Sequence, residues 1–182
     1  MDAYQNIKSL RAIRQFNSQP VEEDSLLRIL EAGRWTGSAK NTQPWHFIVI
    51  RERRVLEQLA RCGQYASHLR GAALAIVIVT ESGGFGNFDA GRVSQNMMLA
   101  AWAEGIGSCI ATLHDQTCAR QILGLPDDKF AMTAISFGYP DPGQPQTIEG
   151  QPQARVLAQL GRRAMSEIVR WEKWSSEESE SR

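Results

Sequence analysis

Two arginine pairs in this sequence could bind an anionic group. Arg11 and Arg14 lie three residues apart in "LRAIRQF", so on a helix or a turn their side chains would share a face. Arg162 and Arg163 are adjacent and precede an expected C-terminal helix. A guanidinium presents a planar fork of donors that matches phosphate or carboxylate oxygens. The sequence therefore indicates two candidate anion sites, with an ordinary solvated basic face as the alternative for each.

The stretch "GSAKNTQPWHFIVI" could bind the edge of a planar ring. Ser38 and Ala39 are small, so the backbone N–H groups around them can approach a flat or anionic ligand closely. Asn41 and Gln43 each carry a donor and an acceptor, which suits an imide-like edge. Functional residues are often found on loops that a rigid scaffold positions. The alternative is an ordinary connection between a helix and a strand.

Other catalytic and metal-binding patterns find little support in the sequence. "GIGSCI" lacks the third glycine of GxGxxG, and there is no P-loop or GxSxG motif. Cys109, His114 and Cys118 match no strong zinc spacing, and no fourth ligand is evident. His46 and His68 have no neighbouring acidic residue of the kind that a catalytic triad needs. We therefore interpret both histidines as structural and expect no metal.

The composition is that of a globular protein without a general affinity for nucleic acid or membrane surfaces. The 182 residues are 42% hydrophobic, which fits one domain or one subunit of an intertwined oligomer. The 20 basic and 20 acidic residues cancel, which argues against a general nucleic-acid or membrane-surface binder. No stretch is apolar enough over the length of a membrane span, and no signal peptide is expected at the N-terminus.

The three cysteines, Cys62, Cys109 and Cys118, are odd in number and form no CxxC pair. Such a pattern is typical of intracellular proteins, in which thiols are kept reduced. We interpret all three as reduced packing residues and expect a cytoplasmic protein.

The hydrophobic pattern places the candidate residues among mixed helices and strands. Helices are expected over residues 3–10, within 16–35, and over 53–60, 89–104, 115–124 and 165–174. Strands are expected over residues 47–51, 72–80, within 105–113 and over 130–140. Residues 140–153 are rich in Pro, Gly and Gln and predict an extended arm, and residues 175–182 predict a frayed tail. The expected class is α/β or α+β.

Five segments, in order, resemble the nitroreductase family of FMN-dependent oxidoreductases. They are "RAIRQF", "SAKNTQPWHFIV", "DAGRVSQNMMLAAWAEGIGSC", "LGLPDD…AISFGYP" and "GRRAMSEIVRWEKW". The resemblance covers Leu10 to Trp174, and the five segments together are more specific than any one of them. It implies a three-layer α/β/α fold of the α+β class, with a central, mostly antiparallel sheet, in a single domain over residues 1–174.

The resemblance also implies an intertwined homodimer that binds two FMN molecules at the subunit interface. Arg11 and Arg14 would contact the phosphate and the ribityl or ring region, and Arg162 and Arg163 would close over the phosphate. The loop after residue 37 would reach a flavin bound mainly by the other subunit, and backbone groups of residues 110–112 would line the ring. The residues implied to bind the cofactor are Arg11, Ala12, Arg14, Ser38, Ala39, Asn41, Gln43, Ile110, Ala111, Thr112, Arg162 and Arg163.

The chain departs from the family pattern at several positions. Leu10 and Ala12 stand where many members have Arg and Ser, so Arg162 and Arg163 are expected to matter more for the phosphate. Gly37 replaces a proline that is common before the serine. The chain is also short for the family, which predicts small insertions over the active site and an open substrate pocket.

The implied reaction is ping-pong: NAD(P)H reduces FMN and leaves, and a nitroaromatic, quinone or related acceptor then takes the electrons. Arg14 is the candidate for stabilising the negative charge of the reduced ring, and no acid–base side chain is expected. Two alternatives remain: a flavin-destroying or dehalogenating relative, and a flavin-binding store or sensor without turnover.

Overall fold

The structure is a computed structural model that describes residues 2–81, 86–142 and 161–174 of the chain. The chain divides into two compact units, Met1–Gln146 and Thr147–Arg182. Every strand of the described residues lies in the first unit, and the described part of the second contains one short helix, α7 (Met165–Ile168).

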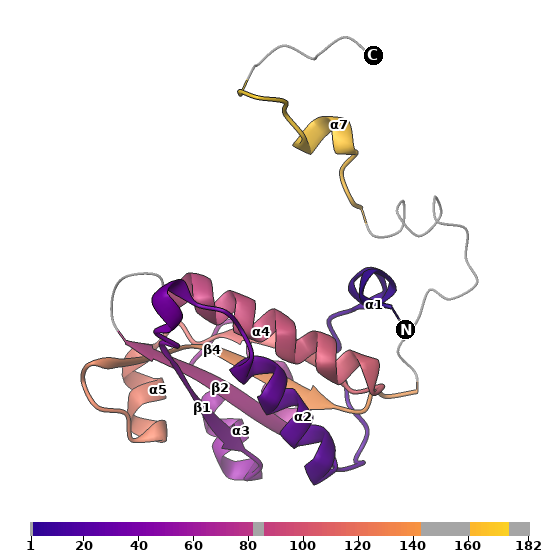
Figure 1. Ribbon diagram of the computed structural model, residues 1–182. Coiled ribbons are helices and arrows are strands. Elements are labelled where there is room, and N and C mark those ends of the chain that lie inside the picture. The colour runs from indigo at the N-terminus through magenta and orange to yellow at the C-terminus, as the bar shows by residue number, and fades with distance from the viewer. Residues whose placement is uncertain (1, 82–85, 143–160, 175–182) are drawn as a thin grey trace. The chain divides into compact units, whose positions relative to one another are not determined.

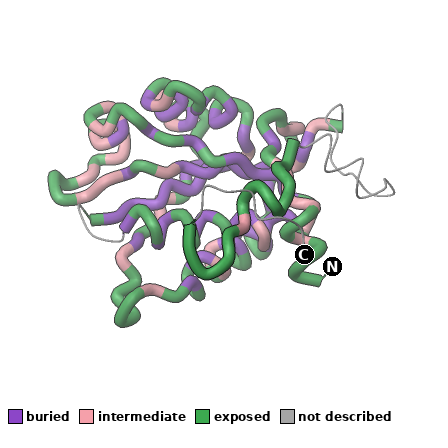
Figure 2. The backbone as a smooth tube through the Cα atoms, turned by 90° about the horizontal axis from the view of Figure 1, so that it is seen from above, coloured by how far each residue is buried: buried purple, intermediate pink, exposed green. Residues whose placement is uncertain are grey.

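A four-stranded antiparallel sheet forms the centre of the first unit (Figure 1). The strands are β1 (Trp45–Ile50), β2 (Leu74–Glu81), β3 (Gly107–Thr112) and β4 (Lys129–Gly138), in the order β1-β2-β4-β3. The first seven residues of β2 are buried, as expected for a central strand that is covered on both faces. The edge strands β1 and β3 are only partly buried. Figure 2 shows the buried backbone concentrated along the sheet.

Helices cover both faces of this sheet, which makes a three-layer α+β fold. One apolar cluster joins α2 (Glu23–Arg34) and α4 (Gly86–Ala103) to the side of β2 that carries Ile76 and Ile78. A second cluster joins α3 (Arg53–Leu59) and α5 (Gln116–Leu123) to the side that carries Ala75 and Val77. Successive strand residues point to opposite faces, so one strand supplies both clusters. The fold class implied by the resemblance is confirmed.

The ends of the helices follow their capping residues. Asp115 precedes α5, and its carboxylate accepts the backbone N–H of Cys118 at 2.9 Å. Gly124 ends the same helix with φ 64°, a left-handed conformation that suits glycine. On α2, Leu26, Ile29 and Gly33 are buried on one face, as their spacing predicts. The helix α1 (Ala3–Ser9) also matches the expected N-terminal segment closely.

The second unit differs from the sequence-based expectation. The helix expected over residues 165–174 ends at Ile168, and the next residue, Val169, has an extended backbone with φ −99° and ψ 133°. The neighbouring β-branched residues and tryptophans are poor helix formers, and no side chain of α7 is buried. Most of the predicted arm, residues 143–153, and the predicted tail, residues 175–182, lie outside the described residues. Among the residues described, no helix has the length and apolarity needed to cross a membrane.

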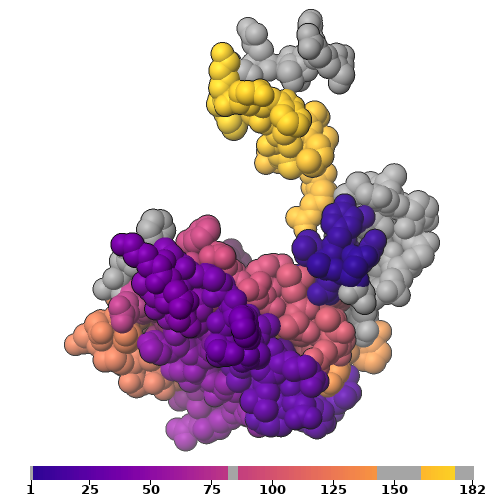
Figure 3. Space-filling view, viewed as in Figure 1, coloured from indigo at the N-terminus to yellow at the C-terminus, as the bar shows by residue number. Residues whose placement is uncertain are grey.

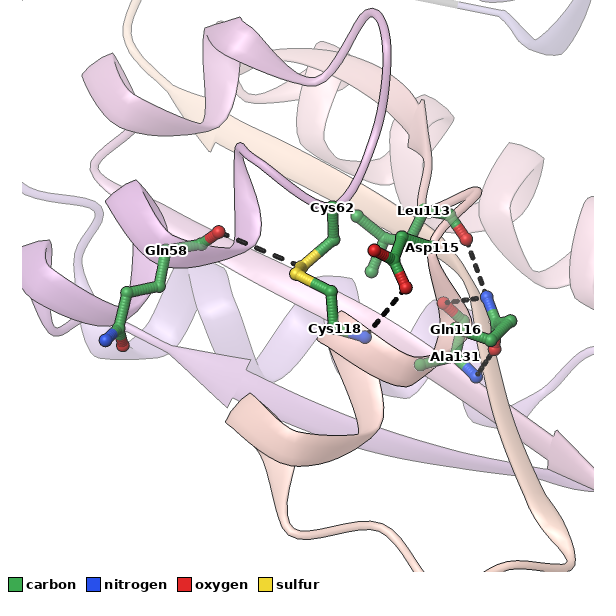
Figure 4. The surroundings of a disulfide bond; sticks show 7 residues. All are labelled: Gln58, Cys62, Leu113, Asp115, Gln116, Cys118 and Ala131. Carbon is green, nitrogen blue, oxygen red and sulfur yellow. Dashed lines mark hydrogen bonds between the residues drawn. A yellow bond between two sulfur atoms is a disulfide. The ribbon is translucent and has the colours of Figure 1, made fainter.

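The interpretation of all three cysteines as reduced thiols is wrong for two of them. Cys62 and Cys118 form a disulfide, with Cα atoms 5.6 Å apart (Figure 4). Cys109 is free and buried. The backbone N–H of Asp115 donates to the Cys62 carbonyl at 2.9 Å, so the loop after α3 meets the start of α5. The two cysteines are 56 residues apart in the sequence. They come close together because α3 and α5 pack on the same face of the sheet.

Candidate functional site

The N-terminal segment is extended and pairs with the edge strand β3. The backbone of Ala12 forms a parallel bridge with Ser108, and the N–H of Ile13 donates to the Ser108 carbonyl at 2.9 Å. Gly107 permits this approach, because a Cβ atom there would lie 2.7 Å from side-chain atoms of Ile13. Phe16 forms a second bridge, to Pro140 beyond the end of β4. The arginine motif is thereby held against the sheet, next to residues 110–112.

Arg11 and Arg14 do not lie on a helix, so they do not share a helical face. Residues 10–22 contain no helix, and in an extended chain residues three apart point to opposite sides. Arg11 is half-buried, and its Nη1 donates to the carbonyl oxygens of Lys8 and Leu10, both at 2.7 Å. Those carbonyls belong to the end of α1, where a cation is favourable.

Arg14 lies beside a buried polar cluster that is formed by His68, Ser136 and Cys109. The His68 ring Nδ1 and the Ser136 hydroxyl are hydrogen-bonded at 2.8 Å, and that hydroxyl donates to the Cys109 carbonyl at 3.2 Å. Burial, and then the charge of Arg14, lower the pKa of His68, while the backbone of Ile110 opposes this. Burial raises the pKa of the Cys109 thiol against the effect of Arg14. Both groups are therefore neutral near pH 7.

The interpretation of His68 as structural agrees with this cluster, but Ser136 was missed by sequence reasoning. Ser136 is fully buried in β4, within the otherwise apolar stretch "AISFG". A buried hydroxyl needs a partner, and an isolated polar residue in a buried strand is the signal that could have indicated one. The partner itself could not be identified without the fold, because His68 is 68 residues away.

The outer part of β3 presents an apolar residue to solvent. Ile110 is 43% exposed and Thr112 is exposed, whereas Ala111 between them is buried. Ile110 pairs with Ile135, which belongs to the cluster under α2 and α4, so Ile110 lies on that face at the uncovered edge. An exposed isoleucine on a strand edge can pack against a flat ligand or a partner surface.

The loop after α2 has an unusual backbone. Lys40, Asn41 and Gln43 have φ values of 52°, 56° and 47°, in the left-handed region that residues other than glycine rarely adopt. The Ser38 hydroxyl accepts the N–H of Gln43 at 2.8 Å, and the Ser38 carbonyl accepts that of Asn41 at 3.1 Å. Ala39, Lys40 and Asn41 form the short 3₁₀ helix η1. Such strain persists only where surrounding contacts hold it, and it is common at functional sites.

An open groove of about 590 Å³ begins at this loop and runs between α2 and β1. Gln43 is the predicted cofactor residue that lines it, beside the apolar side chains of the edge strand. The lining residues are Leu27, Leu30, Glu31, Arg34, Gln43, Trp45, Phe47 and Val49. The Glu31 carboxylate there is hydrogen-bonded to Arg34 and Trp35, which lowers its pKa to about 2. Arg162 and Arg163 lie in the second unit, where both are exposed and precede α7.

The first unit thus has the architecture of a three-layer α+β protein with an N-terminal segment paired to the sheet edge. The nitroreductase family model matches residues 7–66 and 61–139. The chain belongs to the nitroreductase family.

Similar proteins and similar solved structures agree with this assignment. A Methanothermobacter thermautotrophicus protein with the provisional name NADH dehydrogenase/NAD(P)H nitroreductase is 32% identical over 149 residues, which cover 77% of this chain and 78% of that protein. A provisionally named Desulfovibrio desulfuricans nitroreductase, solved in complex with FMN, has 28% identity and a TM-score of 0.70, covering 86% of this chain and 96% of that one. An FMN-dependent nitroreductase of Clostridium difficile has the same fold, with a TM-score of 0.80 at 24% identity over 93% and 98% of the two chains.

Proposed function

We propose that this protein is an FMN-dependent oxidoreductase that uses NAD(P)H to reduce nitroaromatic, quinone or related acceptors by a ping-pong mechanism. Residues 1–174 would act as one nitroreductase domain, and two chains would form an intertwined homodimer. The names of the Methanothermobacter thermautotrophicus and Desulfovibrio desulfuricans relatives support the nicotinamide and the flavin, respectively.

The observation that carries this proposal is the bridge between Ala12 and Ser108. It brings the arginine motif, which lies far away in sequence, to the strand that presents Ile110. A cationic segment and an exposed apolar strand side by side suit a ligand that is both anionic and aromatic.

The chemistry of the available donors fits FMN. Arg14 is exposed, and its positive charge acts on His68 and Cys109, next to the stretch of β3 at residues 110–112 where a ring would lie. The exposed side chains of Asn41 and Gln43 supply both donors and acceptors for the imide edge of a flavin. Arg11 is the weaker phosphate candidate, because its guanidinium already donates to two carbonyl oxygens. Arg162 and Arg163 remain candidates for the phosphate.

Bound FMN would supply the hydride and electron transfer, and the protein would supply binding, orientation and electrostatics. Arg14 would stabilise negative charge on the reduced ring, because a fixed cation in a partly desolvated site needs no reorganisation. Ile110 would exclude water from one side of the ring. His68 and Cys109 are both buried away from solvent, so we assign neither of them a proton-transfer role.

The test is the absorption spectrum of the purified protein before and after anaerobic addition of NADH or NADPH. We expect flavin bands at about 370 and 450 nm that bleach on addition and return with a quinone or nitroaromatic acceptor. Bands that persist with both nicotinamides and every acceptor would instead favour a flavin store or sensor. Absence of the bands after incubation with FMN would overturn the proposal.

A further inference from the structure

The strained loop after α2 is held from outside by α4. Arg92 of α4 donates from Nη1 to the carbonyl oxygen of Gly37 at 2.5 Å. Figure 1 shows η1 beside the start of α4, and Figure 3 shows α2 and α4 side by side on one face. Gly37 is the residue directly before Ser38, whose hydroxyl and carbonyl organise the loop. Because glycine has more conformational freedom than any other residue, a contact there restrains the entry to the loop most effectively.

Arg92 is itself oriented by two neighbours on α4. Its Nη1 lies 3.6 Å from Oδ1 of Asp89, whose side chain is only 5% exposed. The ring of Phe88 lies under the guanidinium, 5.8 Å from its centre. A buried carboxylate requires a compensating charge, so Asp89 and Arg92 form a unit. Arg92 therefore points toward the loop and not freely into solvent.

A second contact from the same face of α4 supports the first. Asn96 lies four residues after Arg92, and its Nδ2 donates to the hydroxyl of Thr36 at 2.8 Å. Thr36 is only 5% exposed and precedes Gly37. Two consecutive residues at the loop entry are therefore held by side chains one helical turn apart on α4.

We propose that Arg92, supported by Asp89, is a positioning residue for the cofactor loop. By holding Gly37, it sets the place of the left-handed residues Lys40, Asn41 and Gln43 and hence of the amide groups offered to the ligand. This inference rests on the proposed function for the identity of the ligand. The contact between Arg92 and the loop itself is independent of it.

The experiment compares Arg92→Ala with Arg28→Ala in the full-length protein. Arg28 of α2 is a matched control, because its Nε also forms an ion pair, 2.5 Å from Oε1 of Glu104, the residue directly after α4, but it lies away from the loop. FMN affinity is measured by quenching of flavin fluorescence, and amide hydrogen exchange is measured without FMN. We expect Arg92→Ala to weaken FMN binding by about tenfold, since one hydrogen bond from a charged group is lost, and Arg28→Ala to leave it unchanged.

Hydrogen exchange distinguishes a positioning role from a general loss of stability. In Arg92→Ala, the amides of Asn41 and Gln43 should exchange faster, while those of β2 should remain as protected as in the wild type. Arg92→Lys, which keeps the charge, should recover part of both properties. If Arg92→Ala does not fold because Asp89 is left unpaired, the double variant Asp89→Asn, Arg92→Gln is used in its place.

Unchanged FMN affinity and unchanged exchange of the loop amides in a folded variant would overturn the inference and leave the proposed function intact. If the wild type binds no FMN, the proposed function fails, and the exchange of Asn41 and Gln43 alone then decides whether Arg92 positions the loop. Faster exchange of amides throughout the first unit of Arg92→Ala, including those of β2, would show that Arg92 has only a structural role. That result would also overturn the inference.

Discussion

The hydroxyl of Ser38 accepts the backbone N–H of Gln43 at 2.8 Å and so closes a loop in which three residues are left-handed. This bond crosses the strained segment, since Lys40 and Asn41 lie between its two partners. The energy needed to hold such a backbone must come from contacts of this kind. The loop is therefore held in one conformation by its own hydrogen bonds.

Removing the Ser38 hydroxyl should weaken cofactor binding more than it weakens the fold. We expect Ser38→Ala to reduce FMN affinity by about two- to tenfold, since one hydrogen bond contributes about 0.5–1.5 kcal/mol. A fluorescence titration with FMN measures this, with Ser67→Ala at an exposed position of η2 (Ser67–Gly71) as the control. Equal affinities of the two variants would mean that the hydroxyl has no part in organising the site.

Lys40 should tolerate glycine better than an ordinary exposed residue does. Lys40→Gly relieves the left-handed strain at φ 52°, and we expect the free energy of unfolding to rise by up to about 1 kcal/mol. The control is Gln95→Gly on the exposed side of α4, which should lower it by about 1 kcal/mol. Urea unfolding of both variants tests the difference, and comparable destabilisation would show that Lys40 is not strained.

Arg14 should contribute to flavin binding or to its potential. We expect Arg14→Ala to lose FMN affinity or to shift the flavin potential downward, because a cation near the reduced ring is removed. Arg11→Ala is the matched control and should have the smaller effect, since Arg11 is engaged by the carbonyls of Lys8 and Leu10. Full FMN occupancy with the wild-type potential in Arg14→Ala would contradict the assignment.

His68 should make the protein less stable at low pH. Burial and Arg14 lower its folded pKa below the ordinary 6.5, so the unfolded chain binds the proton first as the pH falls. Stability is then lost as the pH drops from 6.5 through the folded pKa. Urea unfolding between about pH 7.5 and 5 should show this loss, and His68→Gln should reduce it. The control variant His46→Gln, at an exposed position, should lose stability with falling pH as the wild type does.

The disulfide between Cys62 and Cys118 should stabilise the fold. A disulfide that spans 56 residues lowers the entropy of the unfolded chain and so stabilises the fold by about 4 kcal/mol. A reducing agent should therefore lower the free energy of unfolding by about that amount. Cys62→Ala, Cys118→Ala should be insensitive to the reducing agent. Thiol counting in the denatured, unreduced protein provides a direct check. One free thiol is expected from Cys109, and three would support the original interpretation of reduced cysteines.

Short-range features of the sequence were sufficient for most elements. The uncharged stretch 72–80 predicted β2, and Asp115 and Gly124 predicted both ends of α5, because a cap acts on the adjacent turn. The loop after residue 37 was recognised as a candidate site from its small and amide residues. The segment 165–174 was overestimated as a helix, since a helical pattern without packing contacts does not stabilise about three turns.

The sequence by itself determined where most helices and strands and the candidate loop occur, because these depend on neighbours a few residues away. The tertiary structure alone decided which polar groups meet. It separated Arg11 from Arg14 by pairing their segment with β3, joined Cys62 to Cys118, and set Arg92 against Gly37 across 55 residues. Contacts over such distances depend on how the helices pack on the sheet, and no local pattern of residues specifies them.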